Sequence, residues 1–168
     1  MEQLWAPWRM ELIEKGEPKG GCIFCELPKL QNDRDNLVLG RTERTFAILN
    51  KYPYNNGHLM VVPRRHAGEP HGLDEGEWSD LSANLRAAEQ IVHKVYRPHG
   101  FNVGMNLGRV AGAGIADHLH WHVVPRWNGD TNFMPVIGLS KVMLEHLQKS
   151  WERLRPHFEA EFSKVDKW

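Results

Sequence analysis

The sequence has few cysteines, no net charge and no long apolar run, and each absence excludes a class of protein. Two cysteines among 168 residues are too few for a disulfide scaffold. The 21 basic and 21 acidic side chains cancel, so no long-range field attracts a nucleic acid polymer or an anionic membrane. The apolar runs are far shorter than the roughly 20 residues that span a bilayer, and residues 1–16 lack a signal peptide's apolar core. We expect a soluble, cytoplasmic protein without a membrane or a nucleic acid polymer as partner.

The length and composition are those of one ordinary globular domain. Hydrophobic residues make up 41% of the chain and charged residues 25%, which excludes wholesale disorder. We interpret residues 1–168 as a single domain. Residues 1–30, which are rich in proline and glycine, form an N-terminal arm, and residues 130–168 form a C-terminal extension.

The hydrophobic pattern predicts strands joined by hairpins with one long helix between them. Residues 36–50 read as two short strands around a turn at 40–43, and the apolar run at 58–63 reads as a strand buried on both faces. Alternation over 101–107 predicts a strand with one buried face, and 117–125 reads as another strand. Apolar residues at helical spacing, the first of them Trp78, predict a helix over 77–97. A C-terminal helix marked by residues from Val142 to Leu154 is stopped or kinked at Pro156, and the whole is an α+β fold on an antiparallel sheet.

The most informative feature is the alternation of His118, His120 and His122. On a strand, alternate side chains share one face, so the three imidazoles would line up while Leu119 and Trp121 point into the core. Such a row can hold a catalytic metal with an open position for water. Alternatively, one neutral imidazole attacks phosphorus while its neighbours stabilise charge and move protons. A solvated face that happens to contain histidine is the third reading.

A glycine-rich loop at residues 108–114 closely precedes the histidines. Small residues let backbone N–H groups approach phosphate oxygens, which favours the phosphorus chemistry. The C-x-x-C pair of Cys22 and Cys25 is compatible with a zinc site, a redox dithiol or buried thiols. His58, which follows an Asn-Gly turn, is either a structural hydrogen-bonding residue or part of a site wall.

The segment His118-Leu119-His120-Trp121-His122-Val123-Val124 resembles the motif of the histidine triad (HIT) family of nucleotide hydrolases and transferases. Residues 50–63 and 106–126 resemble the family's ribose-side turn and its loop with the triad strand. LWAPWR near the N-terminus and GDTNFMP after the triad look like the branch that contains bacterial diadenosine tetraphosphate phosphorylases and hydrolases. The resemblance implies a HIT-like five-stranded antiparallel sheet, one long helix, a C-terminal helix and a homodimer.

The resemblance also implies roles for individual residues. His120 would attack an α-phosphate and form a covalent nucleotidyl-histidine, and His122 would bind phosphate oxygens or assist the leaving group. Asn50 would contact ribose, and phosphate oxygens would be held by Asn106 with the backbone of Gly112, Ala113 and Gly114. The family commonly has Gln or Ser in the loop just before the triad, where this chain has Ala113-Gly114-Ile115. Whether water or inorganic phosphate is the acceptor therefore stays open.

Relatives with the cysteine pair imply a structural zinc held by Cys22, Cys25, His66 and His118, with no catalytic metal on the nucleophile. The sequence thus predicts an enzyme that cleaves adenosine or diadenosine polyphosphates, with a small-molecule nucleotide as its substrate. A non-catalytic nucleotide-binding module and a three-histidine metallohydrolase are the alternatives.

Overall fold

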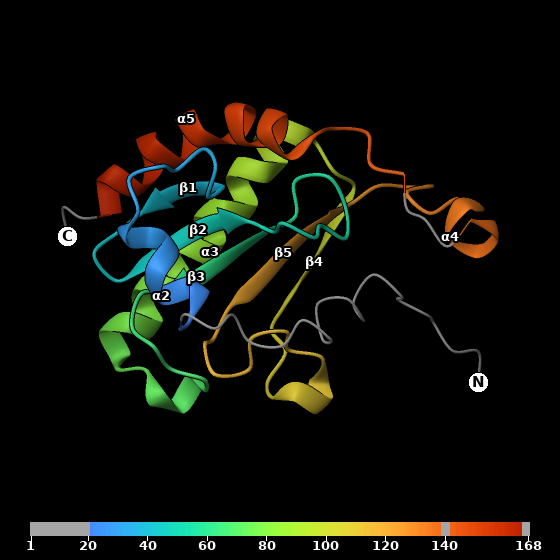
Figure 1. The fold of residues 1–168 in the computed structure, drawn as a ribbon. Helices are drawn as coiled ribbons and strands as arrows, with labels where there is room; N and C mark the ends of the chain where they lie inside the picture. The colour runs from blue at the N-terminus through green and yellow to red at the C-terminus, as the bar shows by residue number, and fades with distance from the viewer. Residues whose placement is uncertain (1–20, 139–141, 166–168) are drawn as a thin grey trace.

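The computed structural model describes residues 21–138 and 142–165, and its centre is a five-stranded antiparallel sheet (Figure 1). Along the sheet the strands follow the order β1-β2-β3-β5-β4. Their bounds are β1 Val38–Arg41, β2 Thr45–Leu49, β3 Leu59–Pro63, β4 Gly100–Gly104 and β5 Trp121–Arg126. The long helices α3 (Glu75–Tyr96) and α5 (Leu147–Val165) pack on the sheet and on each other. The predicted α+β fold is confirmed, while LWAPWR at residues 4–9 lies outside the described residues.

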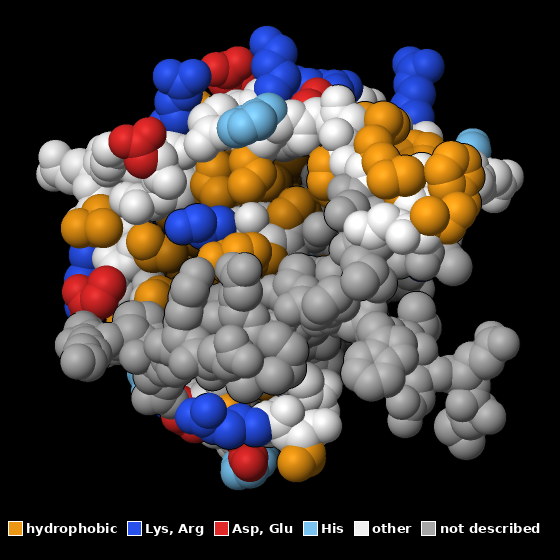
Figure 2. Space-filling model, turned by 45° about the vertical axis from the view of Figure 1, so that its right-hand side comes forward, with side chains coloured by type: hydrophobic (Ala, Val, Ile, Leu, Met, Phe, Trp, Pro, Cys, Tyr) orange, Lys and Arg blue, Asp and Glu red, His pale blue; other side chains and the backbone are white. Residues whose placement is uncertain are grey.

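Short helical turns make up the connections. They are α2 (Ile23–Glu26), η1 (Leu27–Lys29), η2 (Pro70–Gly72), η3 (Arg109–Ala111) and α4 (Met134–Ile137). Helix α4 lies away from the sheet in Figure 1, and Figure 2 shows hydrophobic side chains gathered on one face of the molecule. Within residues 21–138 and 142–165, no helix combines the length and the apolar character needed to cross a membrane.

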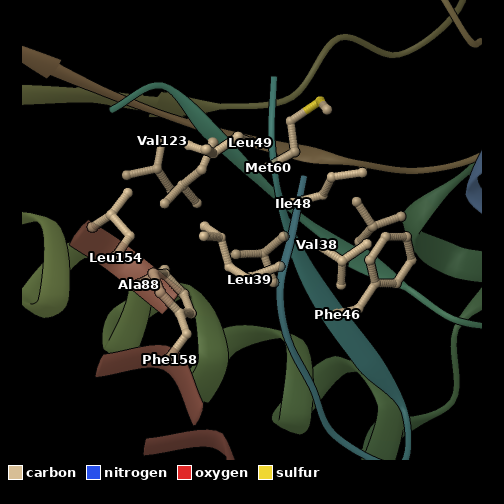
Figure 3. Packing of buried hydrophobic residues seen from close by; sticks show 14 of the residues in the cluster. Val38, Leu39, Phe46, Ile48, Leu49, Met60, Ala88, Val123, Leu154 and Phe158 are labelled. Atoms are coloured by element: carbon tan, nitrogen blue, oxygen red, sulfur yellow. The ribbon is translucent and has the colours of Figure 1, made fainter. Parts of the chain in front are cut away.

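The core lies between the sheet and the two long helices. All residues of β2 and β3 are buried, which confirms the doubly buried strand predicted at 58–63. In Figure 3, Leu154 and Phe158 of α5 and Ala88 of α3 face Leu39 and Val123 of the sheet. The core thus covers one face of β5, and the candidate site lies at its other face.

Strand β5 begins at Trp121, so the prediction of a strand over 117–125 is wrong at its start. The ladder between β3 and β5 pairs Val61 with Trp121, and its continuation would bring Pro63 opposite Leu119. Proline has no N–H to donate, so the pairing ends before that point. The Leu119 N–H instead donates to the carbonyl of Ala67 at 2.6 Å.

The prediction of one buried face along residues 101–107 holds only in part. Phe101 and Met105 pack against the core, whereas strand β4 ends at Gly104 and Val103 and Leu107 are 45% and 43% exposed. The reason is helix coverage, since β1 at the other edge of the sheet is buried under α5, while no long helix of the described residues packs along β4 in the same way. Trp78, expected in the apolar stripe of the long helix, is 37% exposed and packs edge-on against Trp121.

Helix α5 does not stop at Pro156. It runs from Leu147 to Val165 with Pro156 inside it, and Val142 precedes it as an exposed residue. Proline in a helix interior removes one backbone hydrogen bond. Three buried side chains, Leu154 before the proline and Phe158 and Phe162 after it, keep the helix packed on the core.

Helix α3 begins with a reciprocal capping arrangement. The Asp74 carboxylate accepts the Glu77 N–H at 2.8 Å, and the Glu77 carboxylate accepts the Asp74 N–H at 2.9 Å. The Arg65 guanidinium donates to Glu77 Oε1 at 2.6 Å. Because Arg65 stabilises the charged form, the pKa of Glu77 falls from 4.5 to about 2.

Replacing Glu77 by glutamine should lower the free energy of unfolding by about 1 to 3 kcal/mol at pH 7, because charge-assisted hydrogen bonds are lost. The folded pKa of Glu77 is depressed, so its stabilisation is present above pH 4.5 and is lost as the pH falls toward 2. The difference between wild type and Glu77→Gln should therefore shrink as the pH falls from about 4.5 toward 2, in urea unfolding followed by tryptophan fluorescence. The exposed Glu75→Gln is the matched control, and a difference that does not change with pH would contradict the assignment.

Candidate active site and metal centre

Four potential metal ligands converge from three separate segments. Cys22 and Cys25 flank the start of α2, His66 follows β3, and His118 precedes β5. The four ligand atoms lie within 4.8 Å of one another. Cys22 Sγ is 3.1 Å from His118 Nδ1, and Cys25 Sγ is 3.4 Å from His66 Nδ1. A tetrahedral zinc ion would space such atoms about 3.2 to 3.8 Å apart, so two thiols and two imidazoles at these distances form a donor set that suits zinc after small side-chain shifts.

The ring of His118 is already in the form that binds a metal. Its Nε2–H donates to the carbonyl of Pro63 at 2.8 Å, which leaves the Nδ1 lone pair directed at the two sulfurs. Burial lowers the pKa of His118 to about 4, so the imidazole is neutral near pH 7. Neither nitrogen of His118 is therefore used toward the other two histidines of the triad, because Nε2 binds the Pro63 carbonyl and Nδ1 faces the cysteines.

His120 is buried and has a defined tautomer. Its Nδ1–H donates to the carbonyl of His118 at 2.8 Å, so its Nε2 carries the lone pair. Burial lowers the pKa of His120, which keeps the ring neutral near pH 7. The ring of Phe24, between the two cysteines, lies 5.1 Å from the ring of His120 and 5.4 Å from that of His118. The site thus presents a neutral imidazole with an available basic nitrogen.

His122 is linked to a fourth histidine, His58. The Tyr54 N–H donates to His58 Nδ1 at 3.0 Å, so the proton of the neutral His58 ring is on Nε2. That Nε2–H faces His122 Nδ1 at 3.0 Å, and His122 then carries its own proton on Nε2. The rings of His120 and His122 are 5.0 Å apart. The two neighbouring rings thus offer a lone-pair nitrogen on His120 and a proton-bearing nitrogen on His122.

The other predicted site residues lie in two places. Asn50 is 3.4 Å from His58 Nε2 through its amide nitrogen, and its oxygen accepts the Tyr52 N–H at 2.9 Å. Asn106 donates to the carbonyl of Gly112 at 3.4 Å, inside the glycine-rich loop. The N–H groups of Gly112 and Ala113 donate to the loop carbonyls of Arg109 and Gly108. Their role as phosphate donors stays a prediction, and it requires those loop bonds to open.

Sequence reasoning placed neither Tyr54 nor Phe24 in the site. It leaves His58 open between a structural hydrogen-bonding role and a site wall, and the structure gives this residue a hydrogen bond to a triad histidine. The only local signal was its position after the Asn56-Gly57 turn. Phe24 had no signal beyond its place between the two cysteines.

The molecule is an α+β protein in which His120 and His122 lie at the start of β5. Beside them is a cluster of two cysteines and two histidines that includes His118. A site of this kind defines a class of proteins whose chemistry depends on histidine. The chain belongs to the HIT family, since the model of the HIT domain matches residues 31–129.

Similar proteins agree with this assignment. The chain is 45% identical over 156 residues to a protein named AP-4-A phosphorylase from Mycobacterium tuberculosis, covering 88% of this chain and 80% of that protein. It is 33% identical to adenosine 5'-monophosphoramidase hnt1 from Schizosaccharomyces pombe, covering 64% of this chain and 75% of the other. Among solved structures, a Zn-bound histidine triad family protein from Mycobacterium smegmatis shares the fold, with a TM-score of 0.65 and 24% identity, covering 88% and 96% of the two chains.

Proposed function

We propose that the protein cleaves adenosine or diadenosine polyphosphates at an α-phosphate through a covalent nucleotidyl-histidine on His120. The observation that carries the proposal is the hydrogen bond from His120 Nδ1–H to the His118 carbonyl, which leaves Nε2 as the nucleophile. The HIT family assignment and the similarity to a protein named AP-4-A phosphorylase support the substrate class. His120 and His122 are the proposed catalytic residues, and Asn50, Asn106 and residues 112–114 are the proposed nucleotide-binding residues.

The reaction proceeds in two displacements at phosphorus. The His120 Nε2 lone pair forms a bond to the α-phosphorus while the bond to the bridging oxygen breaks, and the polyphosphate leaves as an anion that accepts a hydrogen bond from the Nε2–H of His122. An acceptor oxygen then attacks the same phosphorus, and the P–N bond breaks with its electron pair returning to His120 Nε2. Inorganic phosphate attacks as its anion, whereas a water acceptor releases its proton to the solvent. His58 faces the other nitrogen of His122 and fixes which nitrogen carries the proton. Catalysis rests on positioning and on the hydrogen bond that His122 gives to the leaving oxygen.

Product analysis with diadenosine tetraphosphate tests the function and identifies the acceptor. With inorganic phosphate present, we expect ADP plus ATP, because phosphate resolves the nucleotidyl-histidine in a phosphorylase. AMP plus ATP with and without phosphate would instead assign water as the acceptor. Binding of AMP with no product under either condition would overturn the proposal in favour of a non-catalytic binding module.

We propose that the cluster of Cys22, Cys25, His66 and His118 holds a structural zinc ion. The spacing of the donors and the Nδ1 lone pair of His118 support this assignment. The bound ion would cross-link the segment around α2 to the ends of two strands. A three-histidine metallohydrolase has no support here, because His118 directs Nδ1 at the cysteines while His120 uses Nδ1 for a backbone carbonyl.

We also infer a homodimer whose partner continues the sheet at β4. Val103 on this edge strand is 45% exposed, and an open strand edge with an apolar side chain favours pairing with another chain. Sedimentation velocity should give about twice the mass of the 19.4 kDa chain, and a monomer would contradict the inference. Metal-binding thiolates require a reducing compartment, which supports the cytoplasmic prediction and is checked by cell fractionation.

A further inference from the structure

Asp130, in the GDTNF segment after β5, makes contacts that the proposed mechanism does not use. We propose that Asp130 is a positioning residue for the pair His58 and His122: it holds Asn55, and thereby the turn that orients the His58 ring. The inference rests on the proposed function, since it concerns the proton-bearing histidine of that site. Asp130 itself contacts neither ring in any of the interactions described for residues 21–138 and 142–165.

The Asp130 carboxylate is fixed at the end of the triad strand. Its side chain is 9% exposed, and it accepts from Arg126 Nε at 2.7 Å and from Arg126 Nη2 at 3.0 Å. The Trp127 N–H donates to the same carboxylate at 3.2 Å. The Arg126 guanidinium holds the pKa of Asp130 far below its usual range, so the carboxylate is charged throughout the working pH range. A charged hydrogen-bond acceptor is therefore held beside the turn that contains Asn55 and Gly57.

The turn is fastened to this carboxylate through Asn55, which is buried. Asn55 Nδ2 donates to Asp130 at 2.8 Å and to the carbonyl of Pro125 at 3.0 Å, so both amide protons are used. Gly57 in the same turn has a φ of +73°, and a Cβ there would lie 3.1 Å from the ring of Tyr96. The turn is thus hydrogen-bonded to β5 on one side, and the ring of Tyr96 from α3 lies close to Gly57 on the other.

The fastened turn supplies two hydrogen bonds to His58. The carbonyl of Asn55 accepts the His58 N–H at 3.1 Å, and the Tyr54 N–H donates to His58 Nδ1 at 3.0 Å. The second bond selects the tautomer that donates to His122 at 3.0 Å. Displacement of catalytic groups by about 1 Å costs on the order of a hundredfold in rate. Release of Asn55 would therefore weaken the hydrogen bond from His122 to the leaving phosphate while leaving the nucleotide contacts in place.

The test compares Asp130→Asn and Asn55→Ala with a matched control, Asp33→Asn. Asp33 is 19% exposed and binds two arginines, Arg41 and Arg155, so it offers a similar buried ion pair on another part of the sheet. Both test variants should lower kcat by about 10- to 100-fold, with KM and the Kd for AMP within about threefold of wild type. Their effects on kcat should not add in the double variant, since they break one connection. Asp33→Asn should lose thermal stability but keep kcat.

A spectroscopic readout separates this inference from the proposed function. In the metal-bound wild type, long-range ¹H–¹⁵N spectra should show His122 as a single tautomer protonated on Nε2, and Asp130→Asn should show a mixture. If wild type and Asp33→Asn are active and Asp130→Asn has the wild-type kcat and tautomer, the positioning role is wrong and the function stands. If wild type has no turnover, the function is wrong, and the tautomer comparison alone decides the role of Asp130.

Discussion

Replacing His120 by alanine should reduce turnover of diadenosine tetraphosphate by at least about 10³-fold, because only binding and positioning remain when the attacking group is removed. The ring is buried, neutral and oriented by the carbonyl of His118, so the alanine variant lacks the lone pair that attacks phosphorus. Brief reaction followed by an alkaline quench and mass spectrometry should trap one nucleotidyl group on the wild-type chain. His120→Ala should show none.

The control for this prediction is His71→Ala. His71 has a side chain that is 82% exposed, and its replacement should leave both kcat and adduct formation unchanged. Full turnover by His120→Ala, or an adduct on another residue, would remove the proposed covalent mechanism. Loss of activity together with loss of folding is recognised by a thermal melt.

Removing the proposed zinc ion should destabilise the fold strongly. Structural zinc contributes on the order of 10 kcal/mol in small domains, comparable with the roughly 5 to 15 kcal/mol that stabilises a whole domain. The ligands join α2 to the ends of two strands, and Phe24 between the cysteines is buried against His118 and His120. The double variant Cys22→Ser with Cys25→Ser should lose its metal and melt at least about 10 °C lower.

Metal analysis by mass spectrometry and scanning calorimetry measure this prediction. Chelation of the wild type should reproduce the loss of stability, and added zinc should restore it in the wild type but not in the double variant. The exposed His71→Ala should retain the metal and the melting temperature. The assignment would be contradicted by a purified wild-type protein without zinc, or by a melting temperature that the chelator leaves unchanged.

Local pattern predicted most of the architecture. The apolar run at 58–63 became the buried β3, and the helical spacing from 77 onward became α3, because both signals arise from a period that each element imposes on its own residues. The strand ends and exposed faces were less accurate. Strand β5 begins at Trp121 because Pro63 cannot extend the ladder, and Val103 is exposed because no long helix in the described part of the chain covers β4 as α5 covers β1.

The sequence by itself determined the five strands, the long helix and the closeness of His120 and His122 at the start of β5. These follow from local spacing and from the resemblance to the HIT family. Only the tertiary structure decided that His58 meets His122 across 64 positions and that Asp130 holds Asn55 across 75. Spacing along a chain carries no information about which distant polar groups face one another, because chain packing sets those contacts.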